Sequence, residues 1–105
     1  MRTKQEVIDA VLATIEAHRE QILALGEYFW KNPEPGYREF KTSAKAKEVL
    51  SGLGLPLRDH LSITGMRADL DTGRKGPVLA LLGEMDSLIL PSHPECDPET
   101  GAIHS

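Results

Sequence analysis

The sequence is poor in cysteine and in long apolar stretches, and each shortage excludes something. Cys96 is the only cysteine among 105 residues, so neither an intramolecular disulfide nor a Cys-x-x-Cys metal knuckle can form. A lone thiol fits a reducing compartment. Charged residues interrupt every apolar stretch before it reaches the roughly 18 residues that a membrane span needs. The basic start, residues 1–5, is not followed by an apolar signal core. We therefore expect a cytoplasmic protein with no membrane partner.

Basic and aromatic residues are also too sparse for a nucleic-acid surface. The formal net charge is −4, aromatic residues make up 5% of the chain, and no basic patch is interleaved with aromatics. Hydrophobic residues make up 40% and charged residues 27%, which are ordinary values for a soluble globular chain. At this length we expect at most one domain and no nucleic-acid partner.

Helical periodicity dominates the first half of the chain. Apolar residues at helical spacing predict one long helix over residues 3–31. They are Val7, Ile8, Val11, Leu12, Ile15, Ile22, Leu25 and Phe29. Thr3 and Glu6 have the spacing of a capping box, and Asn32-Pro33 should end the helix. A second helix is predicted over residues 40–53, ended by Gly52 and Gly54.

The second half changes to a period of two. Alternation predicts a strand over residues 64–71, and the continuous apolar run in 78–85 predicts a strand buried on both faces. We expect these two to pair as an antiparallel hairpin, with a weaker strand near 57–60 and a loop over 88–105. The predicted fold is α/β, with two N-terminal helices followed by a two- to three-stranded sheet. Because two helices barely cover a doubly apolar strand, we expect it to be an incomplete part of a larger α/β domain.

The residues that could carry chemistry follow the apolar run. Glu84 and Asp86 are two positions apart, so both carboxylates point to the same side of an extended chain. They could bind a metal or orient a histidine that does, although spacing alone favours a solvated strand end. The tail adds the metal-ligand residue types His93, Cys96 and His104, whose spacing favours a solvated loop.

Five segments in order carry a resemblance. They are Trp30-Lys-Asn-Pro-Glu-Pro-Gly-Tyr-Arg-Glu39, Thr42-Ser43, Thr64-Gly-Met-Arg-Ala-Asp69, Leu81-Leu-Gly-Glu-Met-Asp-Ser-Leu88 and Gly101-Ala-Ile-His-Ser105. Together they resemble the N-terminal part of the zinc-type peptidase and amidohydrolase family. This family includes aminoacylases, hippurate hydrolases, p-aminobenzoyl-glutamate hydrolases and glutamate-releasing carboxypeptidases. The resemblance covers nearly the whole chain.

The resemblance implies the catalytic α/β domain of a metallohydrolase, with two divalent ions, zinc or manganese, and a smaller inserted dimerisation domain. The implied reaction is metal-assisted hydrolysis of the amide bond in N-acyl or N-aroyl amino acids or small peptides. Asp86 matches the aspartate that supports the metal site from behind a ligand. Glu84 stands where other branches have a metal-binding histidine, which leaves its own ligand role in doubt. His104 would lie just before a Cys-Gly-His stretch that binds metal, so no metal ligand is assigned within this chain.

Two interpretations follow from these implications. In the first, the chain is the front part of a larger amide hydrolase, stopping at Ser105 inside an active-site loop. The 105-residue chain itself is then expected to be inactive and to bind no catalytic metal tightly. In the second, it is a non-catalytic α/β module that associates with itself or with a partner; a stand-alone α/β domain of another role is a third interpretation. An exposed sheet edge predicts self-association of the chain in any of these cases.

Overall fold

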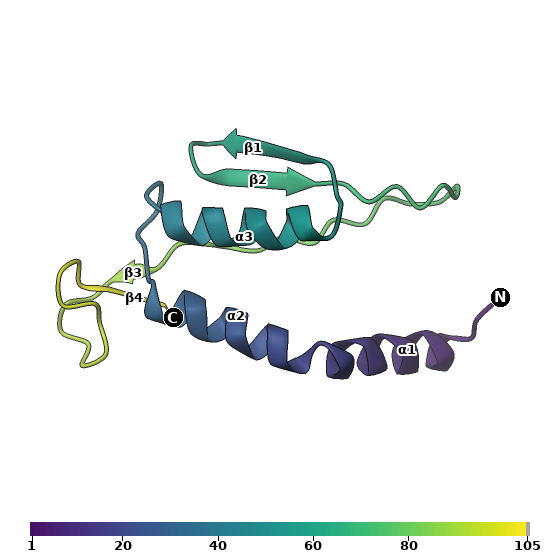
Figure 1. Cartoon of the computed structure of the whole chain (residues 1–105), viewed down its shortest axis with the longest axis horizontal. Coiled ribbons are helices and arrows are strands. Elements are labelled where there is room, and N and C mark those ends of the chain that lie inside the picture. The colour runs from purple at the N-terminus through teal and green to yellow at the C-terminus, as the bar shows by residue number, and fades with distance from the viewer. Residues whose placement is uncertain (105) are drawn as a thin grey trace. The chain divides into compact units, whose positions relative to one another are not determined.

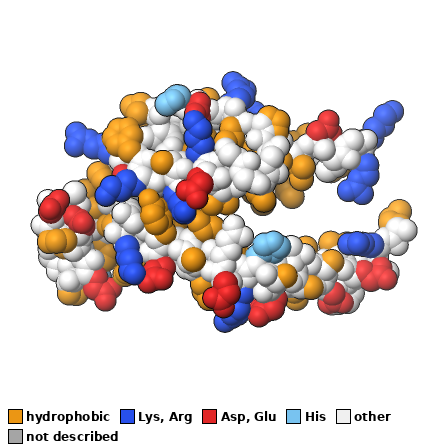
Figure 2. Space-filling model, viewed as in Figure 1, with side chains coloured by type: hydrophobic (Ala, Val, Ile, Leu, Met, Phe, Trp, Pro, Cys, Tyr) orange, Lys and Arg blue, Asp and Glu red, His pale blue; other side chains and the backbone are white. Residues whose placement is uncertain are grey.

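The computed structural model describes residues 1–104, which form two compact units, Met1–Lys31 and the chain from Asn32 onward (Figure 1). Each unit is described by itself. Apolar side chains are visible between the charged groups on the surface (Figure 2). Within residues 1–104, no helix has the length and apolar character needed to cross a membrane.

The first unit is helical, but the single helix predicted over 3–31 is divided at His18. Helix α1 covers Lys4–Ala17 and helix α2 covers Arg19–Lys31. The Thr14 hydroxyl donates to the carbonyl of Ala10 at 2.8 Å, a bond that tends to bend helices. One turn later, a ring nitrogen of His18 lies 2.9 Å from the Thr14 carbonyl and competes for it. These side-chain contacts account for the break, which the apolar period does not reveal.

The start of α1 is as predicted. Thr3 and Glu6 form a capping box, in which the Glu6 amide donates to the Thr3 hydroxyl at 3.2 Å. The Thr3 amide in turn donates to the Glu6 carboxylate at 2.7 Å. Two amides that lack helical partners are thereby satisfied.

The second unit begins with helix α3, Phe40–Gly52, which confirms the helix predicted over 40–53. Gly54 follows it with φ 73°, and its amide donates to the carbonyl of Ser51 at 2.9 Å. A left-handed residue at this place closes a helix at little cost only when it is glycine. The chain then turns into strand β1, Leu57–Leu61, which confirms the strand expected near 57–60.

Strand β1 pairs with strand β2, Gly65–Ala68, as an antiparallel hairpin that lies along α3 (Figure 1). The register sets Leu57 opposite Ala68 and Leu61 opposite Gly65. The predicted strand over 64–71 therefore forms in part, but its predicted pairing with 78–84 is wrong. The turn contains two non-glycine residues with positive φ, Ser62 and Ile63, so the usual glycine or asparagine signal of a hairpin is missing.

The strand predicted over 78–85 is also wrong, because no strand is present there in the structure. The β1–β2 sheet has two strands, and this segment pairs with neither. An apolar run needs a partner strand to become part of a ladder, and none of residues 1–104 supplies one. Its leucines remain exposed.

The predicted loop over 88–105 contains a short ladder instead of being irregular throughout. Strand β3, Leu88–Ile89, pairs antiparallel with strand β4, Ala102–Ile103. Within residues 1–104, Ala102 and Ile103 are the only buried hydrophobic residues. The small core of the second unit thus lies at this ladder, next to the residues with candidate chemical roles.

Candidate functional site

The Pro-Glu-Pro-Gly turn is tied to the start of α3 through the carboxylate of Glu34. This carboxylate accepts from the amides of Lys41 and Thr42 at 3.0 and 2.6 Å, and from the Thr42 hydroxyl at 2.9 Å. Helix N-termini carry amides without helical partners and a partial positive charge, so a carboxylate stabilises them. Glu34 therefore caps α3 from six residues before its first residue.

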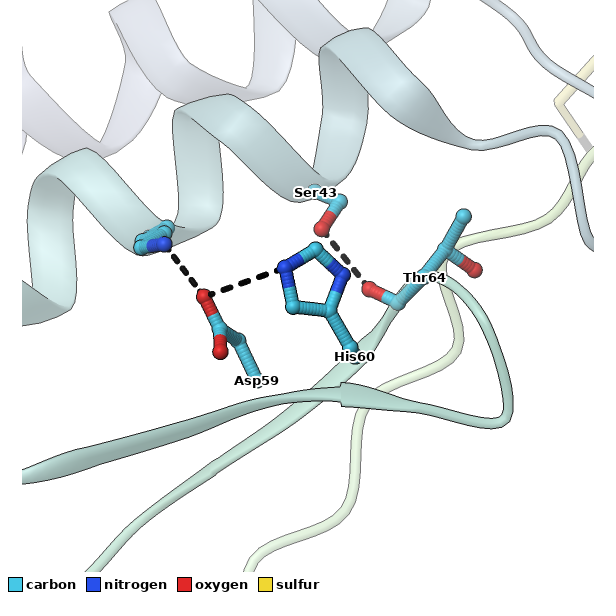
Figure 3. Close-up of polar contacts among 5 residues, drawn as sticks. Ser43, Asp59, His60 and Thr64 are labelled. Atoms are coloured by element: carbon cyan, nitrogen blue, oxygen red, sulfur yellow. Dashed lines mark hydrogen bonds and ion pairs between the residues drawn. The ribbon is translucent and has the colours of Figure 1, made fainter.

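A second polar connection joins α3 to the hairpin. The Thr64 hydroxyl donates to the carboxylate of Glu39 at 2.5 Å, and both residues are buried. The Ser43 hydroxyl donates to the carbonyl of Thr64 at 2.7 Å (Figure 3). The motif residues Glu39, Thr42-Ser43 and Thr64 therefore act structurally, since each holds α3 against a neighbouring segment.

Asp86 lies beside the same turn. The amide of Ser87 donates to the carbonyl of Glu34 at 2.8 Å, and Pro35 and Ser87 form a parallel bridge. A Cβ atom on Gly36 would lie 4.0 Å from the Cβ of Asp86, which is ordinary contact. The turn on one side and β4 on the other thus fix the backbone that carries Asp86. We call Glu34–Gly36, Asp86–Ser87 and His104 the Asp86 corner.

His104 enters the Asp86 corner through the β3–β4 register. Leu88 pairs with Ile103, so continuing the antiparallel ladder by one residue places Ser87 opposite His104. The Oγ of Ser87 and the Nε2 of His104 are both buried without a hydrogen-bond partner among the described residues. Buried polar atoms without partners are costly and uncommon. This corner is therefore the part of the second unit where a further polar group would be most stabilising.

Glu84 and Asp86 do not form a closed ligand pair. Glu84 is exposed and has no described neighbour that fixes its carboxylate, while Asp86 is half-buried at the level of its corner. The predicted common orientation of the two side chains depends on an extended backbone, which need not persist in a segment outside any sheet. Sequence reasoning missed Glu34 and Ser87, because their contribution depends on a pairing between segments 52 residues apart in number, from 35 to 87.

The other candidate ligands in the tail have local partners. The ring of His93 accepts from the amide of Glu95 at 3.1 Å, and the thiol of Cys96 lies 3.6 Å from the carbonyl of Pro91. Asp97 accepts from the amide of Thr100 at 2.8 Å and from its hydroxyl at 2.9 Å. These bonds from Thr100 hold the pKa of Asp97 below its ordinary value. These residues organise the turn instead of converging on a ligand.

A cluster on the hairpin has the residue types of a catalytic triad without the geometry. Figure 3 shows Ser43, Asp59 and His60 close together. However, the Ser43 hydroxyl donates to a backbone carbonyl, and the His60 side chain is 85% exposed. Asp59 accepts instead from Lys47, and this bond lowers the pKa of Asp59. We assign these contacts to the attachment of β1 to α3, because no base is positioned against the serine.

The described residues do not fit a metal centre by themselves. No group of three or more His, Cys, Asp or Glu side chains in residues 1–104 could hold an ion together. Tight sites for zinc use three or four ligands. At the Asp86 corner only Glu34, Asp86 and His104 have side chains of a suitable type, and Glu34 is already bound to the start of α3. No step of a reaction can therefore be assigned to a metal there.

Comparison with known proteins places the chain among amidohydrolases. It is 31% identical to N-acetyl-L-cysteine deacetylase of Bacillus subtilis over 85 residues, which are 81% of this chain and 20% of that protein. It is 27% identical to a p-aminobenzoyl-glutamate hydrolase polypeptide of Escherichia coli over 84 residues, 80% of this chain and 18% of that protein. An IAA-amino acid hydrolase of Arabidopsis thaliana is 31% identical over 77 residues, 73% of this chain and 18% of that protein. No family model and no solved structure matches.

These similarities confirm the resemblance based on the five motifs. The chain is a distant, partial homologue of the amidohydrolases, and it spans about a fifth of the length of the curated relatives it matches. The matches cover most of this chain, which is consistent with the motifs being spread from residue 30 to the tail.

Proposed function

We propose that this chain forms the N-terminal part of the catalytic domain of a metal-dependent amide hydrolase. The substrates would be N-acyl or N-aroyl amino acids or small peptides. The relatives support the reaction class, since their names describe a deacetylase and amino-acid conjugate hydrolases. The observation that carries the proposal is the Asp86 corner, where the bond from Ser87 to Glu34 holds the supporting aspartate against the motif turn.

In this proposal the chain contributes structure and one side of the site. Glu34, Glu39 and Thr64 hold α3 and the turn in place. Asp86 supports a metal ligand from behind, and the unpartnered Nε2 of His104 belongs to the same corner. The two divalent ions, zinc or manganese, need ligands that the described residues do not supply, because no group of three is present among them. The 105-residue chain alone is then inactive.

A chimera tests the proposal. Residues of this chain replace the matching 85-residue segment of N-acetyl-L-cysteine deacetylase, and the purified chimera is assayed for hydrolysis of N-acetyl-L-cysteine and for bound metal. We expect retained metal and measurable hydrolysis. Asp86→Asn should lower hydrolysis by about a hundredfold, as losses of metal-site supporting groups reach 10–100-fold. Asp71→Asn is the matched control, since Asp71 lies in an exposed turn and accepts only from the amide of Gly73.

Several results would contradict the proposal. A chimera that is folded by circular dichroism but holds no metal would do so, as would equal activities of the Asp86→Asn and Asp71→Asn chimeras. The unfused chain is assayed in parallel with zinc and with manganese. If it binds about one ion per chain tightly, or turns over substrate, the assignment of the ligands to residues other than those described is wrong.

The alternative is a non-catalytic module that associates with itself or a partner. The exposed apolar run in 78–85 favours it, since large apolar patches mark interaction sites. The chimera separates the two proposals, because a non-catalytic module has no reason to rebuild a hydrolase site that depends on Asp86.

A further inference from the structure

The segment from Arg74 to Asp86 has an unusual order of residue types. Its middle is apolar, and the side chains there are nearly fully exposed: Val78 97%, Leu79 84%, Leu81 92% and Leu82 98%. Figure 1 shows it as an extended trace that leads to β3. It belongs to neither sheet of the described chain. Four apolar side chains in an extended run without a covering layer are a surface that favours association.

The two ends of this segment carry opposite charges. Arg74 and Lys75 precede the apolar run, and Glu84 and Asp86 follow it. Such a segment is complementary to a second copy of itself in the antiparallel direction, because each basic end then meets an acidic end. In a parallel pair, like charges would be adjacent, which is destabilising. The order of charges therefore selects both the occupant and its direction.

Pro77 selects the hydrogen-bonding phase. A proline has no amide proton, so in a ladder it must occupy a position whose backbone faces away from the partner. If Ala80 lies opposite Ala80 of the second copy as a hydrogen-bonded pair, alternate residues face the partner. Val78 and Leu82 then exchange hydrogen bonds, and Pro77 points outward at no cost. In the same register Arg74 lies opposite Asp86, so the phase and the charges agree.

We propose that two copies of this chain associate by antiparallel pairing of residues 78–82 about Ala80. One face of the ribbon carries Val78, Ala80 and Leu82 from both copies, and the other carries Leu79 and Leu81. A two-stranded ribbon is marginal by itself in water, so the dimer exchanges readily. This inference does not depend on the hydrolase proposal, since it concerns only the exposed segment.

Cysteine cross-linking in the full 105-residue chain tests the register. Both variants are made in a Cys96→Ser background, which removes the native thiol. In Ala80→Cys the two Cα atoms would lie about 5.5 Å apart, within the range of a disulfide. In the control Val78→Cys they would be about 13 Å apart, since four residues along a strand separate them. We expect Ala80→Cys to form disulfide dimers at least about tenfold faster under mild oxidation, because only its thiols lie within bonding range.

Charge reversal tests the ends independently. In the Cys96→Ser/Ala80→Cys background, Arg74→Asp turns two attractive cross-strand pairs into repulsive ones. The cross-linking rate should fall about tenfold, from roughly 0.7 kcal/mol for each pair. Asp86→Arg should do the same, and the two changes together should restore the rate, because both pairs are re-formed with their signs exchanged.

The results that overturn the inference are distinct. Equal rates for Ala80→Cys and Val78→Cys indicate unspecific collisions, and a double reversal that stays slow rejects the register. A chain that shows no cross-linking in either variant and scatters light as a monomer rejects the dimer itself. Failure of the chimera affects none of these readouts, so the two proposals fail separately.

Discussion

Replacing Thr64 with valine removes one hydroxyl and nearly preserves the shape of the side chain. The lost O–H is the donor to the Glu39 carboxylate at 2.5 Å, where both residues are 7% exposed. Water therefore cannot replace the donor without rearrangement. A hydrogen bond to a charged group contributes about 1.5–3 kcal/mol, and no cavity is created, so we expect a loss of about 2 kcal/mol. The Ser43 bond accepts at the backbone carbonyl of residue 64 and survives.

Amide hydrogen exchange is the suitable assay, because it reports local opening of α3 and β2 without requiring one cooperative transition. A loss of about 2 kcal/mol corresponds to roughly 30-fold faster exchange in these elements. The matched control is Thr72→Val, because the Thr72 hydroxyl accepts only a 3.3 Å bond in an exposed turn. Its effect should stay within about 0.5 kcal/mol. If Thr64→Val exchanges no faster than Thr72→Val, the buried bond does not hold the helix against the hairpin.

Two further predictions concern the tail. Gly101→Ala should weaken the β3–β4 ladder by more than the roughly 1–2 kcal/mol of a left-handed residue, because the new Cβ would lie 2.9 Å from Pro91 Cγ. Gly73→Ala, with similar φ and nothing within 4 Å, has the conformational cost alone, so equal losses of stability in the two variants would reject the contact; exchange at the Leu90 amide reports the first. Bonds from Thr100 lower the pKa of Asp97, so its contribution is full above the unfolded pKa of about 3.9 and lost as pH falls through the lower folded pKa. Carboxyl NMR titration should give a midpoint below the ordinary value that rises in Thr100→Ala; an unchanged midpoint would contradict the assigned cause.

Local signals predicted much of the first half correctly. The Thr3 capping box and the glycines after α3 act within a few residues, so the sequence alone indicates them. The break at His18 was not predicted, because it depends on how Thr14 bonds to the preceding turn. Periodicity measures which face is apolar and is insensitive to such a bend.

Pairing between segments was harder to predict than the segments themselves. The alternating strand over 64–71 was recognised, but its partner was assigned to the more apolar run and not to β1. Apolar content indicates that a segment can be buried, while the partner depends on turn geometry, here at Ser62 and Ile63. The candidate site shows the same limit. Asp86 and His104 were each selected by resemblance, but their common corner depends on a ladder only two residues long.

The loop between Leu90 and Gly101 is closed at its base. The Leu90 amide donates to the Gly101 carbonyl at 2.8 Å, directly beside the β3–β4 ladder. The separation of its two ends is thus set by the backbone at the base and does not depend on the number of residues between them. Lengthening a loop whose ends are already joined costs little, because closure entropy grows only with the logarithm of its length. Insertions near Glu95 should therefore leave Ser87 and His104 in place, which makes this loop a suitable position for an epitope tag or a fluorescent label.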